Sequence, residues 1–237
     1  MTEAGAAFQQ TAADVLARLD QARDDAEAGA SRLAGPIRIT APLSFGVTHL
    51  APALAAFVAG HAEVVLDVRL DDQVVDLQAG GFDLGIRIGR PPNSSLTPRR
   101  LTLVRPYVVG SLDYLARRGR PAVPSHLAGH DVLVYVNADL EAWRAAFPKL
   151  DIGRLNVRFR SDNGDTLREA AIAGLGLLIL PDFLVAASVK GGRLEPLLPS
   201  HPLASAAIYA VSPPGRPILR RVRALVEHLA TAFGPMA

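Results

Sequence analysis

The spacing of apolar side chains along this chain changes at residue 36, and each pattern predicts a different structure. Before that point, small apolar residues recur at alternating spacings of four and three, which is the heptad pattern of a helix that packs on another helix. The apolar seam is narrow and rich in alanine, so the isolated helix would be marginal in water. We therefore expect residues 1–35 to form a linker helix that pairs with a second chain, the alternative being packing against its own domain. The seam consists of Phe8, Ala12, Val15, Leu19, Ala22, Ala26 and Leu33, with Gly29 in the intervening position.

From residue 36 onward, short apolar runs alternate with segments of helical spacing, and Gly35-Pro36 separates them from the first helix. This order predicts an α/β fold with a parallel sheet and right-handed crossovers. The β-branched run at 64–70 predicts a buried strand. In this first part we expect strands at 37–41, 64–70, 82–89 and 101–109, helices over 47–58 and 74–79, a turn at 42–46 and an irregular loop at 90–100.

A second run of strands and helices follows residue 110, and the last strand and helix of the chain are expected to return to the first lobe. The resulting organisation is a hinged binding architecture of two α/β lobes joined by two crossing strands. Lobe 1 is predicted to comprise residues 36–107 plus 208–237, and lobe 2 residues 108–207. The expected strands are 131–136, 155–160, 177–180, 193–198 and 206–211, and the expected helices begin near residues 112, 164, 182 and 219.

Composition narrows the class of protein. The chain is 49% hydrophobic and 20% charged, which suits a packed core and argues against global disorder. It has no cysteine, so disulfides and thiolate chemistry are excluded. The N-terminus lacks the pattern of a signal peptide, and no apolar window is long enough to span a membrane. We therefore expect a cytoplasmic protein that makes no membrane contact.

Charge is unevenly distributed, because nearly all of the 25 basic residues are arginine and six of them lie between residues 99 and 120. Such a cluster could be a nucleic-acid footprint, although a solvated surface is the simpler reading and the one we prefer. His126 and His130 stand four apart, as metal ligands on a helix would. Gly129 interrupts that helix, so we expect two surface histidines. Asp71-Asp72 is expected to be a polar loop after a strand.

No enzyme constellation emerges from the chain. It contains no nucleophile elbow, no phosphate-binding P-loop and no zinc-protease motif. The Gly174-Leu175-Gly176 segment lies after a helix and before a strand, whereas dinucleotide-binding glycines follow a strand and open a helix. We therefore expect no catalytic residues, no cofactor and no metal.

Two strand ends suggest a ligand site instead. In open α/β sheets, ligands bind outside the carboxyl ends of the strands. Ser44 follows the first strand, and Asn163-Gly164 follows the strand that ends at Ser161. Both places lead into a helix, whose unpaired N–H groups favour an anion such as a carboxylate. Ordinary helix capping is the alternative for Ser44 and Asn163. The expected apolar walls are Leu43, Phe45, Ile88, Leu180, Pro181 and Phe183.

Seven segments, in unchanged order, resemble the effector domain of LysR-type transcriptional regulators. They are GPIRITAPLSFG followed by HLAPALAAF, then GFDLGIRIG, RRLTLVRPYVVGSLDYLARRG, FRSDNGDTLREAAIAGLGLLILPDFLV, GRLEPLLP and IYAVSPPGR. The resemblance implies the type 2 periplasmic-binding-protein fold, with a small-molecule effector bound between the lobes. By this resemblance, the effector-binding residues are Pro42, Leu43, Ser44, Phe45, Ile88, Gly89, Asn163, Gly164, Leu180 and Pro181.

The resemblance also implies that residues 3–33 match the linker helix of the family, which pairs subunits into homodimers or homotetramers. Family members begin with a winged helix-turn-helix of DNA-binding function, whereas Thr2-Glu3-Ala4-Gly5 here resembles the end of that head. DNA binding is therefore expected only through an N-terminal domain that this chain lacks.

The expected function is sensing of a small organic acid, carboxylate or aromatic, by a transcriptional regulator. The first alternative is a solute-binding protein of a transport system, which shares the fold but should carry a signal peptide. The second is an enzyme on a similar two-lobe frame, which would need a cofactor or a catalytic carboxylate constellation.

Overall fold

The computed structural model describes residues 32–73, 75–89, 97–214 and 218–234, together with Thr2, Gly5, Phe8, Ala12 and Val15. The chain divides into two compact units, residues 1–102 with 207–237 and residues 103–206. The chain therefore passes twice from one unit to the other. The predicted lobe boundaries at 107/108 and 207/208 stay a prediction.

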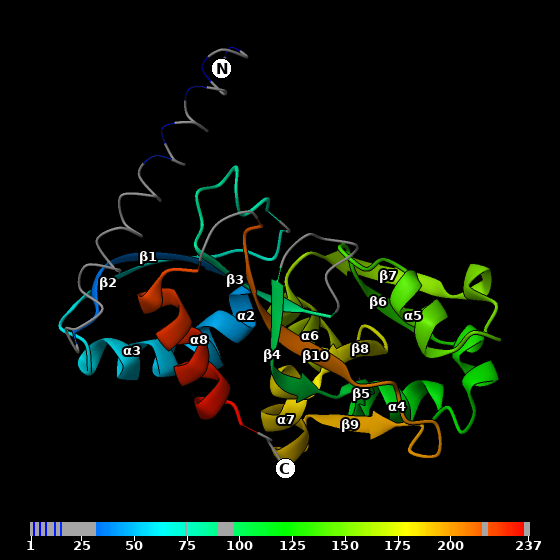
Figure 1. Ribbon diagram of the computed structural model, residues 1–237. Helices are drawn as coiled ribbons and strands as arrows, with labels where there is room; N and C mark the ends of the chain where they lie inside the picture. Colours follow the sequence, from blue (N-terminus) through cyan, green and yellow to red (C-terminus); the bar gives the residue numbers. More distant parts are fainter. Residues whose placement is uncertain are drawn as a thin grey trace. The chain divides into compact units, whose positions relative to one another are not determined.

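Unit 1 is built on a five-stranded sheet in the order β2-β1-β3-β10-β4 (Figure 1). Strand β1 pairs in parallel with both β2 and β3, as the alternating pattern predicts, whereas β10 runs antiparallel to β3. The last strand of the chain thus returns to the first unit. The strands are β1 (Ala34–Ala41), β2 (Glu63–Leu70), β3 (Leu84–Ile88), β4 (Thr97–Val104) and β10 (Ala206–Ser212).

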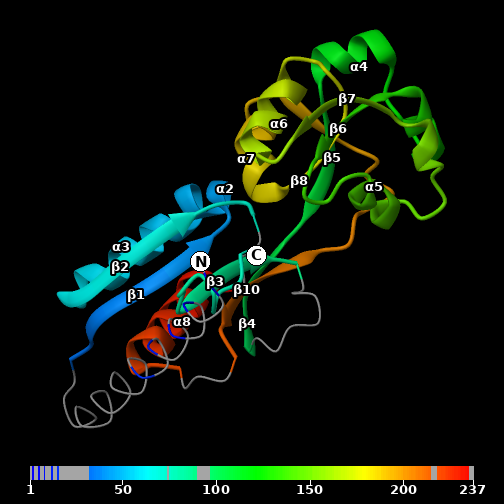
Figure 2. The same ribbon diagram turned by 90° about the horizontal axis from the view of Figure 1, so that it is seen from above.

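Helices α3 (Ala51–Ala59) and α8 (Arg220–Ala232) pack together against this sheet (Figure 2). Side chains alternate along a strand, so Ile37 and Ile39 of β1 point to the same face, and both are buried. The expected turn at 42–46 is wrong. Helix begins at Leu43, directly after Pro42, and continues through α2 (Leu43–Phe45) and a π-helical turn, η1 (Gly46–Leu50), into α3. A proline at the N-cap position leaves the first helical turn undisturbed.

Four further expectations, most of them for unit 1, are wrong. Strand β2 lies at the edge of the sheet, and Val65 is 64% exposed, so the β-branched run is not a buried strand. The described part of 74–79 is not helical: residues 77–79 form turns, and the Leu77 side chain packs with Phe82 against the sheet. Residues 97–100 are strand rather than loop, and the long strand expected at 101–109 breaks at Arg105.

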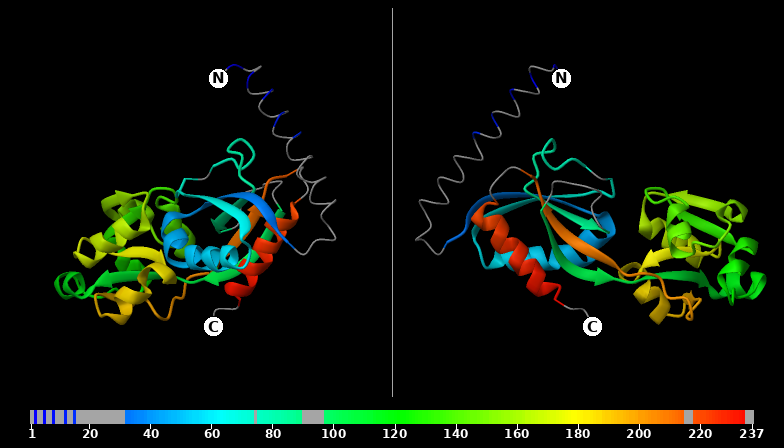
Figure 3. Two further views of the ribbon diagram at one scale, coloured as in Figure 1. Left: turned by 90° about the vertical axis from the view of Figure 1, so that its left-hand side faces the viewer. Right: turned by 45° about the vertical axis from the view of Figure 1, so that its right-hand side comes forward.

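Unit 2 contains a three-stranded antiparallel sheet, β8-β5-β9, and a parallel pair, β6-β7 (Figure 3). Hydrogen bonds from Leu133 to Leu177 and from Leu177 to Asp131 join β6 to the segment before β8. Trp143 is buried and belongs to the hydrophobic core of this unit. The elements are β5 (Pro106–Ser111), α4 (Leu112–Arg118), η2 (Pro124–Gly129), β6 (Asp131–Tyr135), α5 (Glu141–Ala146), η3 (Ile152–Arg154), β7 (Asn156–Ser161), α6 (Gly164–Ile172), β8 (Leu178–Pro181), α7 (Asp182–Lys190) and β9 (Leu194–Leu197).

Most of the predicted linker helix lies outside the described residues. Of its heptad positions before residue 32, Phe8, Ala12 and Val15 are described, and all three are helical. Phe8 and Val15 are exposed in the single chain. The pairing of this helix with another chain stays a prediction.

Candidate functional site

The helix that starts at Leu43 has a protein carboxylate at its N-terminus. Asp72 Oδ1 accepts a hydrogen bond from the Leu43 backbone N–H at 2.9 Å. Asp71 stands beside it and accepts from the Gln73 N–H at 2.9 Å. The acidic pair therefore holds the 71–73 loop and supplies the negative charge that a helix N-terminus favours. Asp72 was expected only as a loop residue, and it takes one of the donors that we had assigned to a ligand.

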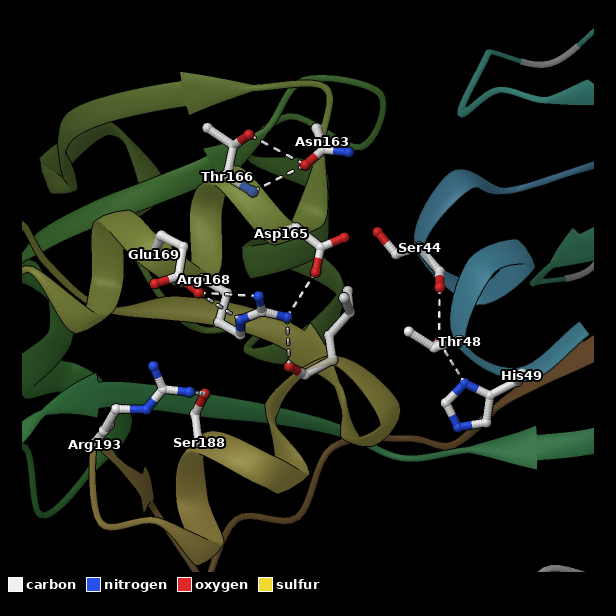
Figure 4. Close-up of polar contacts among 11 residues, drawn as sticks. Ser44, Thr48, His49, Asn163, Asp165, Thr166, Arg168, Glu169, Ser188 and Arg193 are labelled. Carbon is white, nitrogen blue, oxygen red and sulfur yellow. Dashed lines mark hydrogen bonds and ion pairs between the residues drawn. The ribbon is translucent and has the colours of Figure 1, made fainter. Parts of the chain in front are cut away.

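The predicted residues of unit 1 differ in exposure. Phe45 is fully buried and its ring packs against Phe233, with ring centroids 5.5 Å apart. Its side chain therefore belongs to the core of the unit. Ser44 is also buried, and its carbonyl accepts from the Thr48 hydroxyl at 2.7 Å (Figure 4). Leu43 and Ile88 are exposed and remain candidates for ligand contact.

Gly89 follows Ile88 at the end of β3 with a φ of +82°. Residues with a Cβ rarely adopt this backbone conformation, so glycine is favoured at this position. Its N–H donates to the Ala207 carbonyl at 2.8 Å, which keeps the end of β3 paired with the start of β10.

Two polar residues near these strand ends were missed by sequence reasoning. Arg87 Nη1 donates to the carbonyls of Ile86, at 2.9 Å, and Thr40, at 3.4 Å, where β1 and β3 end their pairing. Arg87 Nη2 and Thr40 Oγ1 are buried, and neither has a hydrogen-bond partner among the residues that the structure describes. Burial lowers the pKa of the Arg87 guanidinium. An arginine within a strand carries no special signal in a single sequence, because its surroundings come from another strand.

In unit 2, Asn163 caps helix α6. Its side-chain Oδ1 accepts from the Thr166 N–H at 2.9 Å and from the Thr166 hydroxyl at 3.1 Å (Figure 4). The expected capping role is thus present. Capping uses only the carboxamide oxygen, and the Asn163 Nδ2 donors have no partner within the described part of the chain. Asn163 is half-buried, so these donors are candidates for a ligand.

The neighbours of Asn163 give the start of α6 its shape and charge. A Cβ on Gly164 would stand 2.7 Å from Leu184 Cδ1, so glycine permits close packing of α6 on α7. Asp165 pairs with Arg168 at 2.6 Å, and Arg168 also contacts Glu169 at 2.9 Å. The Asp165–Arg168 pair has the spacing typical of a helix surface, and it was missed because such pairs are common.

Leu180 and Pro181 end strand β8. Leu180 is buried in the core of unit 2, so its side chain serves packing, whereas Pro181 is half-buried and forms the N-cap of α7. Asp182 Oδ2 accepts from the Arg105 N–H at 3.1 Å, and the Asp182 N–H donates to the Arg105 carbonyl at 2.8 Å. These two hydrogen bonds hold Asp182 against Arg105, the residue directly before β5.

The two histidines are not both at the surface, as we had expected. His130 is buried, and its Nδ1 lies 3.3 Å from the Tyr114 hydroxyl, whereas His126 is exposed. Burial lowers the pKa of His130. Within the described residues, no three His, Cys, Asp or Glu side chains group as a metal site requires. None of the helices that the structure describes combines the length and the apolar character needed to cross a membrane.

Comparisons with known proteins agree on one family. The model of the LysR substrate binding domain matches residues 30–234. An HTH-type transcriptional regulator from Haemophilus influenzae is 31% identical over 214 residues, which cover 90% of this chain and 74% of that protein. The HTH-type transcriptional regulator PtxR from Pseudomonas aeruginosa is 32% identical over 240 residues, covering 99% of this chain and 76% of the relative.

Solved structures give the same answer for the fold. The regulatory domain of CrgA, a LysR-type transcriptional regulator from Neisseria meningitidis, superposes with a TM-score of 0.72 at 25% identity, covering 85% of this chain and 100% of that chain. The structure of CrgA itself gives a TM-score of 0.75 and covers 98% of this chain and 80% of its own. The α/β architecture is therefore the type 2 periplasmic-binding-protein-like fold of these domains, and the chain belongs to the LysR-type transcriptional regulators.

Proposed function

We propose that this substrate-binding domain senses a small organic acid that is bound by residues of both units. Unit 1 would contribute Leu43, Ser44 and Ile88, with Pro42 and Gly89 shaping the backbone around them. Unit 2 would contribute Asn163 and Pro181. Phe45, Gly164 and Leu180 would support the site through packing, since all three are buried.

The observation that carries this proposal is that the Asn163 carboxamide uses its oxygen, and not its nitrogen, to cap helix α6. Its oxygen is committed to the N-cap of α6, while its Nδ2 donors have no partner in the described residues. A carboxylate accepts hydrogen bonds readily from such donors, and the nearby N-terminus of a helix favours its negative charge. Ser44, after the first strand, is the proposed second donor.

The effector would act by binding one conformation of the two units better than another, because a ligand shifts an equilibrium only through such a difference. We propose binding without turnover, in the cytoplasm. Residues 1–35 would pair two chains of a homodimer or homotetramer. Contact with DNA would be made by a winged helix-turn-helix of the complete regulator rather than by residues 36–237.

A thermal-shift screen of small aliphatic and aromatic carboxylates tests the proposal, because a ligand bound only by the native state raises its stability. A carboxylate that raises the unfolding midpoint is then titrated by calorimetry into a Ser44→Ala, Asn163→Ser double variant. Serine keeps the N-cap of α6 and removes the amide donors. We expect weaker binding with an unchanged fold, and unchanged affinity in the variant would exclude these two residues from the site.

A further inference from the structure

Unit 2 carries two adjoining hollows that none of the predicted effector residues lines. The apolar hollow has a volume of about 590 Å³, and its walls include Pro124, Phe147, Leu150 and Pro202. The cationic hollow has a volume of about 500 Å³. Both are lined by Ser125, Ala128 and Arg154, so the two hollows adjoin at these residues, and together they are called the depression of unit 2. Each volume lies within the range of roughly 300–1,000 Å³ that is usual for small-ligand pockets.

The cationic hollow is lined by Arg118, Arg120, Arg154 and two histidines, and no described residue that lines it is acidic. Arg120 is already paired, since it contacts Glu195 at 3.0 Å. Arg118 donates to a backbone carbonyl, that of Gly129, at 3.2 Å. Within the described part of the chain, neither Arg118 nor Arg154 has a carboxylate partner. Arg118 also hydrogen-bonds the Tyr114 hydroxyl. Both guanidinium charges are therefore without a carboxylate counter-ion among the described residues.

Two acidic residues of this region, Asp151 and Asp131, accept hydrogen bonds from groups of unit 2. Asp151 lines the apolar hollow, where its Oδ1 accepts from the Gly153 N–H at 3.2 Å. Asp131 accepts from the Asn156 side-chain amide. The pKa of His130 is lowered mainly by burial, and Arg118 and His126 lower it further, whereas Asp131 raises it.

The apolar hollow supplies a complementary surface. Phe147 follows Trp143 by one helical turn, with its N–H donating to the Trp143 carbonyl at 2.9 Å, and both side chains belong to the same core. The wall around Phe147 is therefore part of the packed core of unit 2. A ligand with an apolar body could bury it there while placing a charged group beside Arg154, which both hollows share.

We propose that this depression of unit 2 is a second ligand site, which binds a small organic anion with an apolar body. The oxyanion accepts hydrogen bonds from Arg118 and Arg154, and the apolar body lies against Phe147, Leu150 and Pro202. A nucleic-acid backbone fits these hollows less well, since a concave depression with an apolar wall matches a compact ligand. The site is separate from the proposed effector residues, so the domain would respond to two small molecules.

Calorimetric titration of the full chain with naphthalene-1-carboxylate tests the proposal, with the uncharged naphthalene-1-carboxamide as the matched ligand. We expect Arg118→Gln and Arg154→Gln each to weaken carboxylate binding by about tenfold, because each removes a charge-assisted hydrogen bond. Arg158→Gln is the matched control, since Arg158 is exposed on β7 and lines neither hollow. Arg154→Lys keeps the charge and should retain most of the affinity, which separates loss of charge from loss of fold.

Three results would overturn the proposal. One is carboxylate binding that is equal in wild type, R118Q and R154Q. Another is binding that Asn163→Asp abolishes, because the probe would then occupy the proposed effector site, whose own test uses other residues. The third is displacement of the carboxylate by a short DNA duplex, which would favour a nucleic-acid contact. An affinity that falls in R118Q and R154Q but persists in N163D supports the second site whether or not an effector binds at Asn163.

Discussion

The N-cap of α6 offers a direct measure of what Asn163 contributes to stability and to binding. Asn163 Oδ1 accepts hydrogen bonds from the Thr166 N–H at 2.9 Å and from the Thr166 hydroxyl at 3.1 Å. Replacing Asn163 with alanine removes both hydrogen bonds. Loss of an N-cap of this kind costs about 1 kcal/mol of the free energy of unfolding, within a range of about 0.5–2 kcal/mol. One kcal/mol lowers the unfolding midpoint by roughly 2–8 °C, less if both units unfold together and more if unit 2 unfolds alone.

The informative comparison is with Asn163→Asp. Aspartate keeps an oxygen in the capping position and places a negative charge where a helix N-terminus favours it. We therefore expect the free energy of unfolding of N163D to lie within about 0.5 kcal/mol of wild type. The two Nδ2 donors are lost, however, and a carboxylate effector would meet a like charge. N163D should thus fold normally and fail to bind the effector.

Urea unfolding, followed by the fluorescence of Trp143 in the core of unit 2, measures these differences. Asp162→Ala is the matched control, because Asp162 is exposed and makes no hydrogen bond within the described residues. Equal stability of N163A and D162A would refute the capping argument. If N163D lost as much free energy of unfolding as N163A, the amide NH2 of Asn163, and not its capping oxygen, would stabilise the helix.

Three further predictions follow from buried groups. Gly164→Ala should lower the free energy of unfolding by about 1–3 kcal/mol, because the new Cβ would stand 2.7 Å from Leu184 Cδ1, and a smaller residue at 184 should recover part of the loss in a double-mutant cycle. Thr40→Val should leave the free energy of unfolding unchanged or raise it, since it removes a buried hydroxyl that has no partner among the described residues. Thr48→Val should lower the free energy of unfolding by breaking the 2.7 Å hydrogen bond to the Ser44 carbonyl, and chemical denaturation of both variants decides this. Burial lowers the pKa of His130 in the folded state below the unfolded-state value of about 6.5, so the unfolded chain binds a proton at this residue more tightly. The free energy of unfolding should therefore fall as the pH drops from about 7 through the unfolded-state pKa toward the lower folded-state pKa. A His130→Gln variant whose stability varies with pH as strongly as wild type would contradict this assignment.

Local chemistry explains which features the sequence predicted. The parallel arrangement of β1, β2 and β3 follows from the alternating strand and helix patterns, because a crossover segment between two strands of one sheet favours parallel pairing of those strands. The cap at Asn163 and the helix start after Pro181 depend on side chains within a few residues of each other. The amino-acid pattern also predicted both strand ends at which we place the effector. It predicted as well that the last strand of the chain belongs to the sheet of unit 1.

Tertiary structure decided the burial and the partners of the same residues. Phe45 and Leu180 read as pocket walls in the sequence, yet both are core residues, because the face that a side chain presents depends on what packs above it. Asp72 meets the helix at Leu43 only because the loop after β2 folds back beside β1. Polar contacts over such separations leave no periodic signal.

The depression on unit 2 shows the same limit at the level of a site. The arginine cluster and the pair His126 and His130 were visible in the sequence, and a solvated surface was the simpler interpretation. Only the fold brings Arg118 to Arg154 and to the apolar wall around Phe147, which come from three separate segments of the chain. The sequence determined the residue types and the local elements, whereas the positions of charges that lack a partner depended on long-range packing, which no local pattern encodes.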